Sequence, residues 1–226
     1  MRIAEVFHSI QGEGEFAGTP SVFVRTTGCN LRCWFCDTPY TSFRAEGPIR
    51  DWRDVLSEVL AVDCAHVVLT GGEPLLQPEI VPLAEALRRE GRVVTVETAG
   101  TVFRPVESDL MSISPKLSNS TPLTSARWRE RHDRDRDQPH VIRQLMNASR
   151  FQLKFVVDQP ADLDEIVRYL ARFPEVPREC VWLMPQGTQQ SDLVEKAIWL
   201  APAAARLGHR FCPRMQIELF GSVRGT

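Results

Sequence analysis

The sequence predicts an α/β protein: a single domain, residues 1–226, built on an incomplete (partial) TIM-like barrel of about six parallel strands. Short apolar runs alternate with segments of helical periodicity, and such an alternation implies parallel strands joined by right-handed crossovers. A closed eight-stranded barrel needs about 250 residues, which is more than this chain offers. A composition of 43% hydrophobic and 25% charged residues is that of an ordinary globular protein.

Six short apolar runs predict the core strands, because branched and aromatic residues in such runs are typical of strands buried on both faces. They span 21–25, 66–70, 92–97, 110–114, 152–157 and 180–184, and a further strand is expected at 215–220. Ligands of parallel sheets bind beyond the carboxyl ends of the strands. Functional side chains are therefore expected in the loops after Arg25, Thr70, Glu97, Ser114, Val157 and Met184.

Apolar residues at spacings of three and four predict the helices between these strands. A helix over 51–62 has Asp51 as its expected N-cap, and a second helix over 80–90 stops at Gly91. A third carries Leu163 and Ile166, and the last runs from about 191 to 207 with a kink or break near Pro202.

The region from about 117 to 150 is irregular, and its run from Arg127 to Asp137 alternates basic and acidic residues with little apolar content. We expect a solvated, mobile insertion here; a partner-binding patch is the alternative.

The charge balance excludes several classes of protein. The chain carries 27 Lys and Arg against 29 Asp and Glu, a net charge of −2, so it lacks the basic excess of a typical nucleic-acid binder. No apolar run approaches the roughly 20 residues that span a bilayer, and Glu5 interrupts the segment where a signal peptide needs an apolar core. These features predict a soluble cytoplasmic protein without a direct nucleic-acid or membrane partner.

Cys29, Cys33 and Cys36 form a C-x3-C-x2-C motif directly after the first predicted core strand. Structural zinc usually takes four ligands, and no fourth Cys or His lies nearby in the sequence, although a structural zinc loop remains the alternative. A four-iron cluster held by three thiolates leaves one iron open to a further ligand. Three scattered cysteines are expected to be small buried side chains: Cys64, Cys180 and Cys212.

The motif, with the aromatic Phe35 just before its third cysteine, resembles the signature of the radical S-adenosylmethionine (radical SAM) enzymes. The resemblance implies a radical SAM core in which Cys29, Cys33 and Cys36 ligate a [4Fe-4S] cluster whose open iron binds S-adenosylmethionine. An electron from the cluster then cleaves the carbon–sulfur bond, which yields a 5′-deoxyadenosyl radical. Gly71-Gly72-Glu73-Pro74 follows the next strand and resembles the segment that binds the methionine amino group. Glycines allow close backbone approach there, and Glu73 offers an acceptor for an ammonium group.

Gln11, Glu13 and Arg25 offer donors, acceptors and a bidentate fork that suit a flat heterocycle with amide-like edges and an acid group. A surface turn with an exposed arginine is the plainer alternative. The run 7–14 resembles the branch of the superfamily that converts 6-carboxy-5,6,7,8-tetrahydropterin to 7-carboxy-7-deazaguanine with release of ammonia, for queuosine and related deazapurines. The resemblance covers most of the chain, including 97–101 and 114–116.

The resemblance also implies residue roles, with a substrate-binding segment at 1–28 and a cluster loop at 29–38. S-adenosylmethionine would be held by Phe35, Asp37, Gly72, Glu73, Thr98, Ser114, Pro115, Lys116, Met184, Pro185, Gln186 and Gly187. The pterin would be held by Ile10, Gln11, Gly12, Glu13, Arg25, Thr70 and, on a C-terminal end longer than in members whose terminal carboxylate reaches the substrate, Thr226. Thr38 would ligate Mg²⁺, which prefers oxygen donors.

The implied reaction begins with removal of a hydrogen atom from C6 of the pterin by the deoxyadenosyl radical. The ring then contracts, the hydrogen returns so that S-adenosylmethionine is regenerated, and ammonia leaves. A homodimer and a flavodoxin- or ferredoxin-type reductant are implied as well. Two alternatives share the cysteine loop: an enzyme that installs a glycyl radical on a partner protein, and a non-enzymatic iron–sulfur or zinc-stabilised module. Gln11, Glu13 and Arg25 favour a small acidic substrate.

Overall fold

The computed structural model describes residues 1–226 and confirms the α/β class with an open, mostly parallel sheet. The sheet has eight strands whose order in space follows their order in the sequence. β1 (Ile3–Ile10) pairs antiparallel with β2 (Pro20–Thr26), and every later pair is parallel. β1 and β8 (Arg210–Phe211) are its two edges, so the barrel stays open.

All six predicted core strands are confirmed. They are β2 and then β3 (His66–Gly71), β4 (Val93–Thr98), β5 (Leu110–Ile113), β6 (Phe151–Val157) and β7 (Val181–Pro185). The sequence did not reveal β1, because an edge strand with only one neighbour is half exposed and carries polar residues such as Glu5 and His8 among its apolar ones. β8 is too short for a recognisable pattern.

The predicted strand at 215–220 is wrong, because these residues form the helix α8 (Met215–Phe220). Polar and apolar residues alternate there over only six positions, which is too short a run to distinguish the two structures. In the helix Ile217 is buried, and Gly221, with φ of 72°, follows its last residue.

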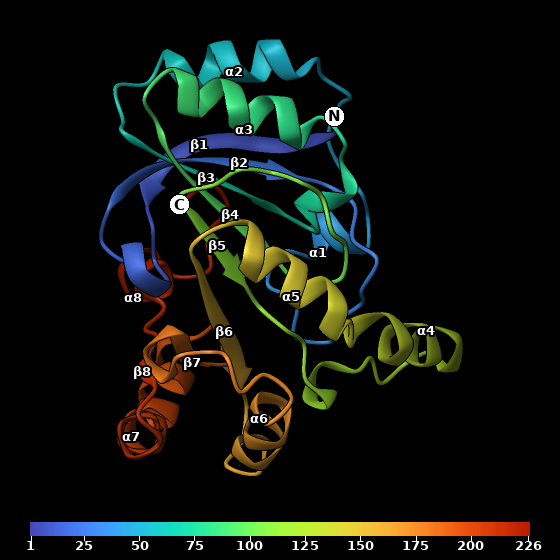
Figure 1. Ribbon diagram of the computed structural model, residues 1–226, viewed down its shortest axis with the longest axis vertical. Helices are drawn as coiled ribbons and strands as arrows, with labels where there is room; N and C mark the ends of the chain where they lie inside the picture. Colours follow the sequence, from blue (N-terminus) through green and yellow to red (C-terminus); the bar gives the residue numbers. More distant parts are fainter.

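Helices cover the outer side of the curved sheet (Figure 1). α2 (Trp52–Leu60) and α3 (Ile80–Arg89) lie together above the first strands, whereas α6 (Asp162–Leu170) and α7 (Gln190–Leu207) lie at the other end. The expected N-cap is confirmed, since Asp51 accepts a hydrogen bond from the Arg53 amide at 2.9 Å. α7 continues through Pro202 without the expected break and ends at Gly208, which has φ of 73°.

The expectation of an irregular insertion at about 117–150 is wrong, because most of this segment is helical. The segment contains α4 (Ala126–Arg136) and α5 (Pro139–Ala148). α5 buries an apolar face, and α4 is a solvated helix in which Arg131 pairs with Asp135 and Arg136 with Asp133. Opposite charges three and four residues apart stabilise a helix, so the charge alternation that suggested disorder supports α4 instead.

The buried apolar side chains of the strands and covering helices form one hydrophobic cluster of 34 residues. Cys64 and Cys212 are buried as expected, but Cys180 is only half-buried because it lies in a single 3-10 turn before β7. No helix is both long and apolar enough to cross a membrane. The C-terminal segment and α8 lie on the open side of the sheet, opposite the covering helices (Figure 1).

Candidate active site

A cavity of about 350 Å³ opens at the carboxyl ends of the parallel strands. The cysteine loop after β2, the glycine loop after β3 and the ends of β4 to β7 all contribute to its wall. Of the candidate site residues, only Glu73, Pro115 and Pro185 do not line it. Residues that are more than 200 positions apart in the sequence therefore face one volume.

The cysteine loop is anchored on several sides. Gly28 has φ of 102°, donates its N–H to the Thr41 carbonyl at 2.7 Å and accepts the Glu73 amide at 2.8 Å. Trp34 donates its indole N–H to the Asn119 carbonyl at 2.6 Å, and the Arg32 amide donates to Nδ1 of His132 at 3.1 Å. The loop is thus fixed between the β3 end and the segment around α4, with its cysteines in the cavity wall.

The three thiols fit a [4Fe-4S] cluster. Burial raises the pKa of Cys29 to about 12 and that of Cys33 to about 11, and the neighbouring thiols add to this effect. Such thiols become thiolates only when positive charge is supplied, as iron supplies it. No three His, Cys, Asp or Glu side chains converge closely enough to hold a single ion, whereas all three thiols face one cavity, as a group held at three corners requires.

The glycine loop after β3 packs against the cysteine loop through bare backbone. A Cβ atom on Gly72 would overlap the Gly28 carbonyl and lie 3.0 Å from the Thr41 carbonyl oxygen, so only glycine fits. Glu73 is fully buried behind this wall. Its carboxylate accepts hydrogen bonds from Thr98 Oγ1 and the Ala99 amide, each at 2.8 Å. In this structure Glu73 therefore fixes the β4 loop and does not face the cavity.

The other candidates for S-adenosylmethionine lie on two sides of the cavity. Lys116 donates to Ser114 Oγ at 2.6 Å after β5. Across the cavity, Gln186 follows β7, and Lys196 of α7 holds both its carbonyl, at 2.7 Å, and its side-chain oxygen, at 2.9 Å. Pro115 and Pro185 are buried beneath these segments and contribute no surface to the cavity.

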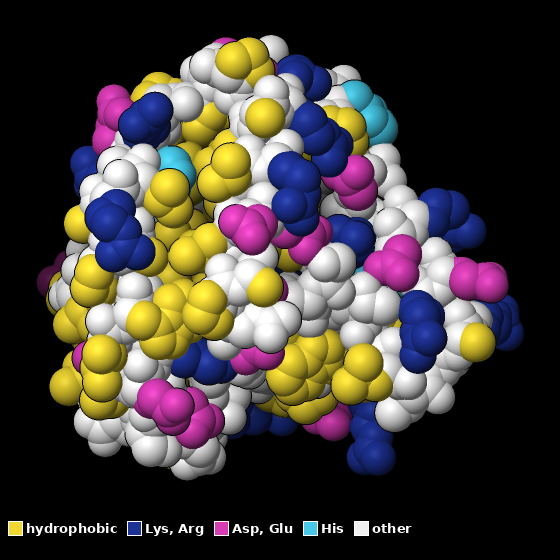
Figure 2. Space-filling view, turned by 90° about the horizontal axis from the view of Figure 1, so that it is seen from below, with side chains coloured by type: hydrophobic (Ala, Val, Ile, Leu, Met, Phe, Trp, Pro, Cys, Tyr) yellow, Lys and Arg dark blue, Asp and Glu magenta, His cyan; other side chains and the backbone are white.

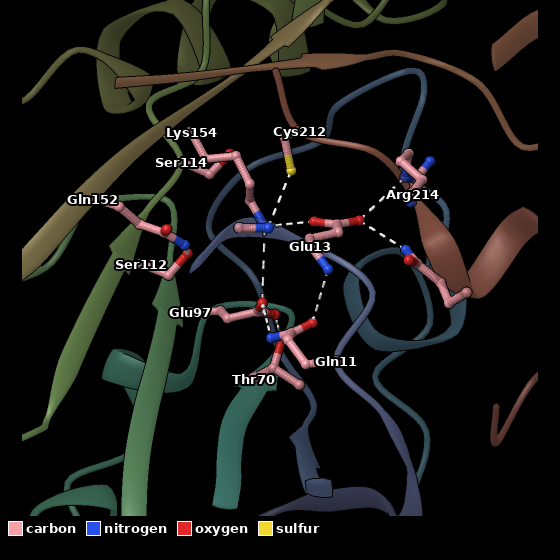
Figure 3. A network of polar contacts seen from close by, with 12 residues as sticks. Gln11, Glu13, Thr70, Glu97, Ser112, Ser114, Gln152, Lys154, Cys212 and Arg214 are labelled. Carbon is pink, nitrogen blue, oxygen red and sulfur yellow. Dashed lines mark hydrogen bonds and ion pairs between the residues drawn. The ribbon is translucent and has the colours of Figure 1, made fainter. Parts of the chain in front are cut away.

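Gln11, Glu13 and Thr70 belong to one polar network (Figure 3). Gln11 donates to Glu97 Oε1 at 3.1 Å and accepts the Glu13 amide at 3.2 Å. Thr70 donates its hydroxyl to Glu97 Oε2 at 2.8 Å. Glu97 was not among the predicted site residues, although it ends the apolar run of β4 and so had a recognisable position.

Three further residues of this network were missed by the sequence reasoning: Lys154, Arg214 and Gln216. Lys154 forms an ion pair with Glu13 and lies 3.8 Å from Glu97. Arg214 donates to Glu13 at 3.1 Å and also pairs with Asp37, and Gln216 donates to Glu13 at 2.8 Å. Lys154 could have been recognised in the sequence, since it is the only charged residue in the run 151–157. No sequence pattern marks Arg214 or Gln216 as site residues.

Electrostatics fix the protonation states of Glu13 and Lys154. Burial alone would raise the pKa of Glu13, but the Lys154 ammonium and the Arg214 guanidinium hold it well below its usual range. Burial would lower the pKa of Lys154, but Glu13 and Glu97 raise it above its usual range. The carboxylate and the ammonium are both charged across the physiological pH range.

Arg25 lies at the mouth of the cavity. Its Nε donates to Glu5, which also accepts from the Tyr40 hydroxyl at 2.8 Å and from Arg224 Nε at 3.0 Å. The last six residues, 221–226, also line the cavity, so Thr226 lies in its wall. Thr38 lines the cavity as well, and its hydroxyl accepts from Thr41 Oγ1 at 3.3 Å.

The partial parallel barrel, with three cysteines on the loop after its first parallel strand, defines a radical S-adenosylmethionine enzyme. The family model described as "Radical SAM superfamily" matches residues 23–115. Structural similarity agrees. QueE from Escherichia coli shares the fold with a TM-score of 0.67 at 23% identity, over 93% of this chain and 92% of that one.

Relatives over the full length define the family more narrowly. The chain is 48% identical to the 7-carboxy-7-deazaguanine synthase of Rhodopirellula baltica, over 99% of this chain and 88% of that protein. It is 42% identical to the enzyme of the same name from Halobacterium salinarum, over 99% of this chain and 92% of that protein. The chain therefore belongs to the 7-carboxy-7-deazaguanine synthase family and is an enzyme.

Proposed function

We propose that the chain converts 6-carboxy-5,6,7,8-tetrahydropterin to 7-carboxy-7-deazaguanine and releases ammonia. The observation that carries the proposal is the identity of 48% with a named synthase. The match spans 99% of the chain and so includes the segments that line the cavity. Cysteines lie on one side of that cavity, and the network of Gln11, Glu13 and Glu97 lies on another. In the proposed reaction the substrate binds between them.

Cys29, Cys33 and Cys36 would hold the cluster. When bound, the cluster and S-adenosylmethionine would supply the radical chemistry that hydrogen removal from C6 of the substrate requires. The residues proposed to bind S-adenosylmethionine in the cavity wall are Phe35, Asp37, Gly72, Thr98, Ser114, Lys116, Met184, Gln186 and Gly187. Glu73, Pro115 and Pro185 would act behind the wall by fixing the loops that carry these groups.

The chain's own residues would bind and orient the pterin. Arg25 would take its carboxylate, because a guanidinium is a bidentate partner for a carboxylate. Gln11, Glu13 and Thr70 would hold its ring edges, next to Ile10 and Gly12. The C-terminal residues at the cavity mouth, including Thr226, would exclude water from the bound substrate.

Thr38 is proposed to contribute one oxygen to a magnesium ion. The cavity offers no cluster of three acidic side chains, so the ion would keep mostly water and substrate oxygens as ligands. Mg²⁺ binds in this manner in many enzymes, where it retains several non-protein ligands. An ion held in this way would orient the substrate and neutralise charge on it.

We propose a homodimer as the working assembly. Apolar side chains gather in a band on the underside of the molecule, bordered by charged ones (Figure 2). On α7, which lies in this part of the fold, Val194 is 58% exposed and Ile198, one turn later, is 73% exposed. Exposed apolar patches of this kind are typical of interfaces, and a second copy of the chain is the proposed occupant.

A flavodoxin- or ferredoxin-type reductant is proposed to deliver the electron at the outer side of the cysteine loop. Trp34 of the loop is 45% exposed, and Phe43, whose ring centroid lies 5.6 Å from the Arg32 guanidinium, is 50% exposed. α4 borders this surface, because the Arg32 guanidinium lies 4.2 Å from the Trp128 ring centroid.

Anaerobic reconstitution with iron and sulfide, followed by incubation with S-adenosylmethionine, reductant and carboxytetrahydropterin, tests the proposal. We expect 7-carboxy-7-deazaguanine to form without net consumption of S-adenosylmethionine. Consumption of S-adenosylmethionine only in the presence of a partner protein would instead identify a glycyl-radical activating enzyme and overturn the proposal.

A further inference from the structure

Lys154 is a buried lysine in the middle of β6, where the residue is 5% exposed. Burying an ammonium group costs free energy unless nearby anions and hydrogen-bond acceptors compensate for the lost water. The run around it, Phe151–Val157, is otherwise uncharged, so a core residue could have occupied the position. Because Lys154 lines the cavity, we expect its charge to serve the groups that bind there.

Charged groups from several elements face this part of the cavity. Glu97 comes from β4 and Glu13 from the segment after β1, and Lys154 lies between the two carboxylates (Figure 3). Arg214, just before α8, is on the far side of Glu13 and forms ion pairs with both Glu13 and Asp37. The Cys212 thiol accepts the Gly14 amide at 3.1 Å nearby, and burial raises the pKa of this thiol to about 12, which keeps it neutral.

Lys154 is poorly suited to transfer a proton in the reaction. The two carboxylates raise its pKa, so the ammonium keeps its proton throughout the physiological range. Glu13 keeps its charge for the corresponding reason. An ionised carboxylate only accepts hydrogen bonds, whereas a protonated one also donates. Lys154 thus keeps Glu13 as an acceptor of hydrogen bonds, and its ammonium also lies 3.8 Å from Glu97.

We propose that Lys154 is a positioning residue: its ammonium holds the Glu13 and Glu97 carboxylates in place on either side of it, and this pair of acceptors selects a ligand edge made of N–H donors. Glu97 is the member that the ligand reaches more easily, since its side chain is 24% exposed and that of Glu13 is 13% exposed. The inference rests on the proposed function and specifies it, because a 2-amino-4-oxopyrimidine ring presents adjacent N–H donors. A ring with oxygen in place of the 2-amino group would present an acceptor to a carboxylate.

Binding of a substrate analogue to the reconstituted enzyme, with S-adenosylmethionine but without reductant, tests this role. The probe is pterin-6-carboxylic acid, whose fluorescence reports binding, titrated between about pH 5.5 and 7.5. We expect the affinity of the wild-type enzyme to be nearly constant over this range. Lys154→Met should bind about tenfold more weakly at neutral pH. Its affinity should rise with pH, because burial without the ammonium raises the pKa of Glu13 and a proton must leave this carboxyl group before the probe binds.

Lys154→Arg retains the positive charge and should keep the affinity within about threefold and the flat pH profile. Arg53→Met is a matched surface control, since the Arg53 side chain is 70% exposed and does not line the cavity. Lys154→Met with wild-type affinity and a flat profile overturns the proposal. If the role of Lys154 is purely structural, Lys154→Met should lose iron content or its cooperative unfolding transition. Its affinity for the probe should then be reduced by the same factor at every pH, which also overturns the proposal.

A second variant keeps the proposal testable if Lys154→Met fails to fold. Glu97→Gln replaces one acceptor oxygen by a donor and leaves Lys154 paired with Glu13. The wild-type enzyme should prefer pterin-6-carboxylic acid over lumazine-6-carboxylic acid, its 2-oxo analogue, by about tenfold or more. The preference should nearly vanish in Glu97→Gln, and an unchanged ratio overturns the proposal. Product formation by the wild type tests the proposed function separately, so the two failures are distinguishable.

Discussion

The carboxylate of Glu5 accepts a hydrogen bond from Nε of Arg25 at 2.7 Å. The guanidinium carbon of Arg25 lies 5.4 Å from the Phe7 ring centroid, so the side chain is held at both its edge and its face. Neither terminal nitrogen of Arg25 has a protein partner, although the residue lines the cavity. Glu5 therefore orients the guanidinium and leaves its two-nitrogen end available to a carboxylate.

Arg25→Ala should mainly weaken binding of the pterin. Loss of a charged, bidentate contact to the substrate carboxylate should raise KM for carboxytetrahydropterin about 10- to 100-fold, with little change in affinity for S-adenosylmethionine. Steady-state kinetics with each ligand varied in turn measure both effects, and Arg53→Ala is the surface control. An unchanged KM for the pterin would mean that the substrate carboxylate binds elsewhere.

Cys33→Ala should abolish the brown absorbance of the reconstituted cluster and product formation together. Three thiolates are the only protein ligands proposed, so loss of one leaves two irons without protein ligands. Cys180→Ala is the matched control, because Cys180 is a half-buried cysteine that does not line the cavity, and this variant should keep both properties. Activity retained by Cys33→Ala would contradict the cluster assignment.

The stability of the fold should decline below neutral pH because of His132. Burial lowers its pKa from 6.5 to about 4. Its Nδ1 accepts the Arg32 amide of the cysteine loop and must be unprotonated to do so. The unfolded chain takes up the proton first as pH falls, so the stabilisation is complete above about pH 6.5 and is lost towards pH 4.

Urea unfolding of the wild type and of His132→Asn at several pH values measures this contribution. The wild type should lose more free energy of unfolding than the variant between neutral pH and about pH 5. Parallel losses in the two proteins would show that His132 is not the titrating group.

The sequence predicted the six core strands because each is buried on both faces and is correspondingly apolar, as in Val67, Val68 and Leu69 of β3. It also predicted the cysteine loop, since its ligands are close together in the chain. α5 was missed although its buried residues follow a helical spacing, because the neighbouring charged run of α4 dominated the reading of this region.

The polar network could be predicted only in part. Gln11 and Glu13 occur in a recognisable local run, but their partners come from distant segments. Glu13 meets Lys154 across 141 residues and Arg214 across 201 residues of sequence. No local periodicity encodes such pairs, because they form only when the sheet curves and brings the segment before α8 over the cavity. The paired charges in turn allow Lys154 to occupy a buried strand position that composition alone would assign to an apolar residue.

Gly12→Ala should displace α8 and weaken the site, because α8 is seated directly on Gly12. The Gly12 carbonyl accepts the Met215 amide at 3.0 Å, and a Cβ at position 12 would overlap the Gln216 side chain and lie 2.8 Å from the Gln216 backbone nitrogen. Overpacking of this kind costs about 1–3 kcal/mol, measurable by urea unfolding. Product formation should fall as well, since Gln216 would lose its hydrogen bond to Glu13.

The double variant Gly12→Ala/Gln216→Ala separates the two parts of this clash. Removing the Gln216 side chain relieves its overlap with the new methyl group but leaves the contact with the backbone nitrogen. Stability should therefore recover in part relative to Gly12→Ala, whereas product formation should stay low because Glu13 still lacks its amide partner. A Gly12→Ala protein with wild-type stability and activity would show that α8 does not rest on Gly12 in solution.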